Sequence, residues 1–281
     1  MPRSLKLYIA GLVAASAVAL LATGFAFPFD PSIAIQLDAD PVTSGPELTL
    51  GIAFWTVVTL VASALPVRMP RGMLVTVSIA PLIAATSLGG PAAGGVVALV
   101  GTTELRELRG KIPALGTLAN HAGLVLCAVA CGLVISGIHL LGGGYPLDFA
   151  ATVGGAVVYF MVNLAIVSGI LALRYGERFT DVLWSDARGF GVSLLGLSPV
   201  AWLMARTYTL PGAGWWTTLL FALPLYTTRV AYHRFVEMRD MFTQTITALA
   251  EAVDKRDPYT SKHSWNVKQI DRKSTRLNSS H

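Results

Sequence analysis

The segment GTLANHAGLVLCAVACGLVISGIHLL, residues 116–141, decides the fold class because it contains no Asp, Glu, Lys or Arg. A helix needs roughly 20 mostly apolar residues to cross the hydrocarbon core of a bilayer. Similar stretches recur along the first 228 residues. We therefore predict an all-α integral membrane protein with about eight transmembrane helices, at 6–27, 48–67, 72–89, 90–104, 116–141, 150–173, 189–207 and 213–232.

The third and fourth of these stretches meet at a Gly-Gly-Pro sequence, Gly89–Pro91, and the fourth is short. Two arrangements remain open for them: two separate spans, or a re-entrant pair that enters and leaves on the same side of the membrane. Both arrangements leave the rest of the topology unchanged, so the span count is seven or eight.

The composition excludes several classes of protein. Of 281 residues, 53% are hydrophobic and 13% are charged, and the mean hydropathy is +0.60. Soluble domains usually contain about 25% charged residues. The two cysteines, Cys127 and Cys131, are too few for a disulfide framework and have no metal-ligand spacing around them. An ordinary soluble enzyme, a disulfide-rich scaffold and a disordered tail are excluded.

The positive charges indicate the topology. With eight spans and a cytoplasmic N-terminus, all Lys and Arg residues up to position 228 except Arg206 fall on the cytoplasmic side. Lys and Arg are retained on that side during insertion, so we expect a multi-pass protein of the bacterial inner membrane with both termini in the cytoplasm. Because the charges follow the loops, the formal net charge of +5 is not evidence for a nucleic-acid partner.

The first apolar stretch has two interpretations. It is either a retained anchor or a cleaved signal peptide, and its length and the lack of a small-x-small exit favour the anchor.

A few polar residues lie within or beside the predicted spans: Glu104, Asn120, His121 and Asn163. Polar groups in lipid are costly and mark sites or interhelical hydrogen bonds. We favour the structural role for each, place Glu104 and His121 at the cytoplasmic interface, and expect hydrogen bonds between helices for Asn163 and for many Thr and Ser residues. Cys127 and Cys131 are expected to be small packing residues.

Residues 229–256 form a predicted cytoplasmic linker helix with an apolar stripe. The stripe consists of Phe235, Met238, Phe242, Ile246, Leu249 and Val253, which recur at helical spacing. Either the stripe packs on a downstream domain, or it forms a homodimer through 235–253 that carries a signal.

The stretch ALAEAVDKRDPYTSKHSWNV, residues 248–267, carries the chemistry. Asp257 precedes Pro258, which ends the helix, and Thr260 or Ser261 can cap a new helix near His263. An imidazole in the first turn of a helix can ligate a metal, although spacing alone gives a lone His little weight.

This stretch resembles the opening of an HD-GYP domain, the branch of the HD phosphohydrolases that hydrolyses cyclic di-GMP. The matching residues follow the pattern LA.A…ARDPYT..HS..V, and they are Leu249, Ala250, Ala252, Arg256–Thr260, His263, Ser264 and Val267. The resemblance implies that His263 is a ligand of a divalent metal centre of the Fe or Mn type. Three-metal members carry a Glu where this chain has Tyr259, so the resemblance implies a metal pair.

The remaining features of that family, its His-Asp pair, later His ligands and Gly-Tyr-Pro signature, do not follow in the sequence. One ligand cannot hold and activate a water, so we expect this chain to be catalytically incompetent and truncated within 257–270. Residues 271–281 back-translate in one frame into a sequence that resembles a sequencing adapter, and we interpret them as an artefact.

Three functional hypotheses follow. The first is a membrane sensor or anchor (residues 1–228) of a signalling protein whose missing output domain hydrolyses cyclic di-GMP. The second is a small multi-span permease whose tail matches the motif by chance. The third is a sensor with a non-catalytic HD output. The stimulus that the membrane part senses is not readable from the sequence.

Overall fold

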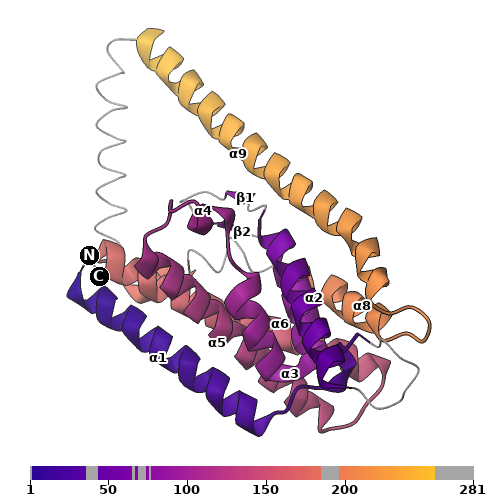
Figure 1. Ribbon diagram of the computed structural model, residues 1–281. Helices are drawn as coiled ribbons and strands as arrows, with labels where there is room; N and C mark the ends of the chain where they lie inside the picture. The colour runs from indigo at the N-terminus through magenta and orange to yellow at the C-terminus, as the bar shows by residue number, and fades with distance from the viewer. Residues whose placement is uncertain are drawn as a thin grey trace. The chain divides into compact units, whose positions relative to one another are not determined.

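The computed structural model describes residues 2–35, 44–64, 67–68, 74–75, 77–184 and 196–256 (Figure 1). The described chain is almost entirely helical. Its elements are α1 (Arg3–Ala26), η1 (Pro31–Ile33), α2 (Gly45–Ser63), β1 (Val67–Arg68), β2 (Leu74–Val75), α3 (Ile79–Gly101), α4 (Leu105–Leu108), α5 (Ala114–His139), α6 (Tyr145–Tyr175), α8 (Ser198–Tyr208), η3 (Trp215–Phe221) and α9 (Ala222–Arg256).

The chain divides into two compact units. The first contains residues 1–67 and 74–229, and the second contains residues 68–73 and 230–281. The helix α9 begins in the first unit, and its larger part belongs to the second. All packing described below lies within the first unit.

Five helices are long and apolar enough to cross a membrane, which indicates a membrane protein. They are α1, α2, α3, α5 and α6. The predicted spans at 6–27, 48–67, 116–141 and 150–173 correspond to α1, α2, α5 and α6. The predicted count of eight is not confirmed. Of the segment 189–207 only the part from residue 196 is described, and it contains the short helix α8. The segment 213–232 is divided between η3 and the start of α9.

Two separate spans at 72–89 and 90–104 are not confirmed. Within these segments the structure describes the element α3, whose helix is broken at Gly90, where φ is 80° and ψ is −175°. Glycine reaches this backbone region without a steric penalty, and Pro91 can begin a new helix because it needs no hydrogen-bond acceptor there.

The two arms of α3 fold back on each other. A Cβ placed on Gly94 would collide with the side chain of Thr86, although eight residues of straight helix would separate the two by about 12 Å. Each arm is about 11 residues, or roughly 16 Å, long, about half of what a membrane crossing requires. The element is therefore a helical hairpin, as in the re-entrant arrangement.

The hairpin forms the centre of the bundle. α3 packs against α2, α5 and α8, and most of its residues are buried, including Leu82, Ile83 and Val97. The helices α1, α5 and α6 lie side by side (Figure 1). The outer surface is apolar: Phe25 of α1 and Val61 of α2 are 88% and 64% exposed. Apolar groups on the outside are expected where the solvent is lipid.

Small residues permit this packing. Gly132 of α5 lies against the backbone of Pro91, so that a Cβ there would approach the Pro91 Cα to 2.5 Å. A Cβ on Gly101 would approach Thr59 and Thr56 of α2 to 2.9 and 3.0 Å. Small residues at such crossings let helix backbones approach closely in a membrane. Gly94, Gly95 and Gly155 make similar close contacts.

The hairpin apex meets the connection between α1 and α2, at the end of the bundle that we call the far end. The Asp30 N–H donates to the Gly89 carbonyl at 3.3 Å. The Tyr208 hydroxyl of α8 donates to the carbonyls of Ile33 and Ala34 at 2.8 and 3.2 Å. The bonds from Tyr208 satisfy the carbonyls of the buried residues Ile33 and Ala34, as a low-dielectric interior requires. The end that contains Arg3 is the near end.

We predict that Gly132→Ala destabilises the fold and that Gly137→Ala does not. A methyl at position 132 meets the Pro91 backbone, which cannot move aside easily, and overpacking of this kind costs about 1–3 kcal/mol. Gly137 lies in the same helix with open space around its Cα, where alanine gains helix propensity. The measurement is the apparent melting temperature of the two purified variants in detergent. Equal melting temperatures would contradict the hairpin contact.

Candidate functional site

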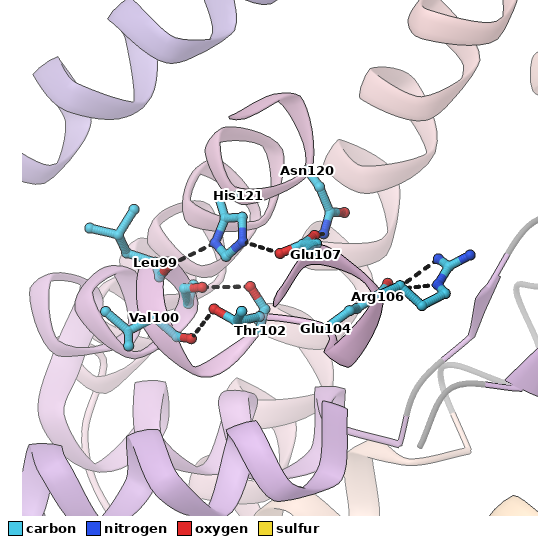
Figure 2. Close-up of polar contacts among 10 residues, drawn as sticks. Leu99, Val100, Thr102, Glu104, Arg106, Glu107, Asn120 and His121 are labelled. Carbon is cyan, nitrogen blue, oxygen red and sulfur yellow. Dashed lines mark hydrogen bonds and ion pairs between the residues drawn. The ribbon is translucent and has the colours of Figure 1, made fainter. Parts of the chain in front are cut away.

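A cluster of polar side chains lies at the near end of the bundle, where the second arm of α3 leads through α4 into α5. It contains Glu104, Arg106, Glu107, Asn120 and His121 together with the last turn of α3 (Figure 2). The cluster joins three consecutive elements of the first unit.

Local sequence explains how these residues are presented. The hydroxyl of Thr102 donates to the Ala98 carbonyl at 2.6 Å and that of Thr103 donates to the Val100 carbonyl at 2.7 Å. These bonds satisfy carbonyls that a helix end leaves without partners. The chain then forms the single turn α4, and Pro113 precedes the first residue of α5. His121 lies two turns into α5, so its side chain meets α4 and the end of α3.

His121 bridges two elements. Its Nδ1 lies 2.7 Å from the carbonyl oxygen of Leu99, and its Nε2 lies 2.8 Å from Oε2 of Glu107 (Figure 2). The side chains of His121 and Glu107 are 13% and 4% exposed, so the pair is largely shielded from solvent. One imidazole thus connects the hairpin arm, α4 and α5.

The hydrogen-bond chemistry requires one proton between the two side chains. A carbonyl oxygen only accepts, so Nδ1 carries a hydrogen and donates to Leu99. The contact between Nε2 and Oε2 then needs a second hydrogen, either on the imidazole as a charged pair or on the carboxyl group as a neutral pair. Without it, two lone pairs would face each other at 2.8 Å.

Two further contacts surround this pair. The amide nitrogen of Asn120 donates to Oε1 of Glu107 at 3.4 Å. Arg106 donates through Nε and Nη2 to Oε2 of Glu104 at 3.1 and 2.7 Å. The Arg106 side chain is 34% exposed, so its ion pair contributes less than the buried bridge.

The arrangement can hold the hairpin arm against α4 and α5, and it can exchange a proton. Among the described residues, no three His, Cys, Asp or Glu side chains come together as a metal-binding group. We call the contacts of His121 with Leu99 and Glu107 the His121 bridge.

Several residues singled out in the sequence are now placed. Glu104 and His121 lie together at the near end, and Cys127 and Cys131 are buried and free, as expected of packing residues. The interhelical hydrogen bond expected for Asn163 is not found, because its amide has no partner among the residues that the structure describes. Sequence reasoning missed Glu107, which looks like one of several charges in a polar connection.

The Thr hydroxyls also differ from the expectation. Thr23, Thr56, Thr86 and Thr152 each donate to a carbonyl four residues earlier in their own helix. The sequence predicts hydrogen bonds between helices for many Thr and Ser residues, whereas these four hydroxyls bond within their own helix. Bonding within the helix satisfies the hydroxyl without fixing a neighbour, which leaves helix contacts to small side chains.

His263, the residue that the HD-GYP resemblance makes a metal ligand, lies outside the described residues, as does Tyr259. The same holds for the predicted start of the HD-like domain, residues 257–270, and for 271–281.

We predict that His121→Leu lowers stability far more than Arg106→Gln. Removal of the imidazole leaves the buried Glu107 carboxyl group and the Leu99 carbonyl without their partner, and breaking a buried pair in this way costs about 3 kcal/mol. Loss of the half-exposed Arg106 pair costs below about 1 kcal/mol. The measurement is thermal unfolding in detergent. Equal melting temperatures for the two variants would show that the His121 bridge does not stabilise the fold.

Comparison with known proteins gives no relative. No family model matches the chain, and no curated protein and no solved structure matches it.

Proposed function

We propose that this chain is the membrane sensor or anchor of a signalling protein whose output domain hydrolyses cyclic di-GMP. The observation that carries the proposal is the course of α9. It runs as one helix from Ala222 to Arg256, and Arg256 is the first residue of the segment RDPYT, which matches part of the pattern of an HD-GYP opening. One continuous helix therefore joins the end of the apolar bundle to the sequence that would open such a domain.

The chemistry of the output domain rests on the resemblance. A pair of Fe or Mn ions would supply an activated water that attacks a phosphodiester bond of the dinucleotide. His263 would hold one of these ions through an imidazole nitrogen. Several protein ligands and an open position are needed for such chemistry, so we place the remaining ligands in a sequence downstream of Ile270.

The membrane unit supplies an element with two arrangements. The His121 bridge fastens the second arm of the hairpin to α4 and α5 by short bonds at 2.7 and 2.8 Å. A shift of the arm that breaks these contacts would open the bridge. A stimulus at the hairpin would thereby alter the packing of the bundle, which is how a switch transmits a local change.

The linker stripe favours a dimer. Its apolar positions repeat every 11 residues. Phe235, Met238 and Phe242 are each followed 11 positions later by a further member of the stripe, in the order Ile246, Leu249 and Val253. An 11-residue repeat gives 3.67 residues per turn and keeps a stripe nearly straight, with a slight right-handed supercoil. The first five stripe residues, from Phe235 to Leu249, are 51–65% exposed. A second copy of the same helix would cover them along its whole length.

We predict that Phe242→Cys forms a disulfide-linked dimer in membranes under mild oxidation and that Asp240→Cys does not. Position 242 lies within the stripe, and position 240 lies on the opposite side of the helix. The native cysteines are buried and do not compete. Non-reducing electrophoresis measures the result. Equal crosslinking at both positions would reject a dimer through 235–253.

We predict that the protein completed with its downstream sequence hydrolyses cyclic di-GMP with added Mn²⁺ or Fe²⁺. His263→Ala should reduce the rate to background and lower the bound metal, because it removes a ligand. His233→Ala is the matched control, since His233 is an exposed residue of α9 paired with Glu237. The chain of residues 1–281 should show no turnover, and measurable turnover from it would contradict the proposal.

The genomic sequence gives an independent test. An in-frame His-Asp pair and a Gly-Tyr-Pro motif downstream of Ile270 would support the phosphodiesterase. A stop codon soon after Ile270 would reject it in favour of a small permease. An intact domain without hydrolysis would indicate a non-catalytic HD output.

A further inference from the structure

The far ends of α6 and α8 form an aromatic and cationic ladder outside the site described above. Tyr145 and Phe149 lie one turn apart at the start of α6, and Trp202 and Arg206 lie one turn apart near the end of α8. The guanidinium of Arg206 lies 4.1 Å from the centre of the Tyr145 ring. The rings of Trp202 and Phe149 meet edge to face with centroids 5.3 Å apart. The two helices thus pair residue by residue.

Two hydrogen-bond donors in this ladder have no acceptor. The indole Nε1 of Trp202 and the Nε of Arg206 are shielded from solvent and make no hydrogen bond within the described chain. A buried donor without an acceptor costs about 1–3 kcal/mol, and more when it is charged. Both donors belong to one helix and are four residues apart, so they lie on the same face.

The charge of Arg206 is also unbalanced. Among the residues that the structure describes, no carboxylate forms an ion pair with it. The nearest acid along α6, Asp148, is 3.5 Å from His139. The Tyr145 ring covers a face of the guanidinium, while the N–H groups at its edge keep their capacity to donate.

The ladder is open at one side. Tyr145 is 57% exposed and Phe149 is 39% exposed, whereas Arg206 and Trp202 are only partly exposed. Because both nitrogens are shielded from solvent, a ligand reaches them only when the exposed ring of Tyr145 or Phe149 moves aside. An acceptor with negative charge and more than one oxygen matches a guanidinium edge and a neighbouring indole N–H.

We propose that Arg206 and Trp202 form a binding site for an oxyanion, a phosphate or carboxylate group, at the far end of the bundle between α6 and α8. The group accepts hydrogen bonds from Arg206 Nε and from Trp202 Nε1, and it neutralises the guanidinium. Two sources have this chemistry: the phosphodiester of an anionic lipid headgroup and a small soluble anion. The site does not depend on the cyclic di-GMP hypothesis.

The experiment uses the full chain and compares both sources. In the lipid arm, native mass spectrometry counts retained phosphatidylglycerol on the detergent-purified protein. In the soluble arm, inorganic phosphate or acetate is titrated against the protein in phosphatidylcholine nanodiscs, with the melting temperature as the readout. Retained lipid alone assigns the site to a headgroup, and anion-dependent stabilisation assigns it to a soluble ligand.

We predict that Arg206→Gln weakens the observed binding at least tenfold, as expected when a charge-assisted hydrogen bond is lost. Trp202→Phe keeps an aromatic ring at this position but removes the indole N–H, and it should weaken binding about fivefold. Arg206→Lys keeps the charge without the planar fork and should lie between wild type and Arg206→Gln.

Two controls match these variants. Arg174→Gln removes a cation that also lies over a tyrosine, at 5.6 Å from the Tyr175 ring, and Trp184→Phe removes an indole N–H from a residue that is 65% exposed. Neither should change binding. The proposal is overturned if wild type binds neither probe, or if Arg206→Gln and Trp202→Phe bind like the controls. If Arg206→Gln fails to fold, binding is measured on Arg206→Lys, which keeps the positive charge.

Discussion

The close packing of the α3 hairpin against α2 and α5 is the constraint on which the rest of the structure depends. Lipid offers no hydrogen bonds, so a chain that reverses inside an apolar bundle must be surrounded by protein. Gly90 permits the reversal, and Gly132 allows α5 to approach Pro91 at the apex. The Asp30 N–H satisfies the Gly89 carbonyl that the broken helix leaves free. These contacts all depend on a close approach to the hairpin apex. If α5 lay farther from the apex, a void would remain beside Pro91, and if Asp30 lay farther from it, the Gly89 carbonyl would lose its donor.

The two ends of the bundle use polar groups differently. At the near end, the His121 bridge is complete: Leu99, His121 and Glu107 satisfy one another with one shared proton. At the far end, Trp202 and Arg206 present donors that no described residue accepts. A satisfied network stabilises one arrangement, whereas unsatisfied buried donors favour a ligand that supplies the missing oxygens.

The linker helix α9 adds a third kind of surface. Its stripe is apolar and exposed, and polar residues occupy the rest of its circumference, whereas the outer surface of the bundle is apolar all round. Such a helix is suited to water on one side and to a protein partner on the other. The 11-residue spacing would allow two copies of this helix to pair without strong supercoiling.

The sequence by itself determined the all-helical membrane class, the positions of α1, α2, α5 and α6, and the break at Gly89–Pro91, since hydropathy, length and Gly/Pro chemistry are local properties. It also pointed to Glu104 and His121 at one end of the bundle. Only the tertiary structure decided that residues 79–101 form a hairpin, that His121 pairs with Glu107, and that Arg206 meets Tyr145. Spacing along the chain does not predict these contacts, because each joins different helices or helix arms, and their crossing depends on small residues such as Gly132 and Gly94 that carry no signal of their partners.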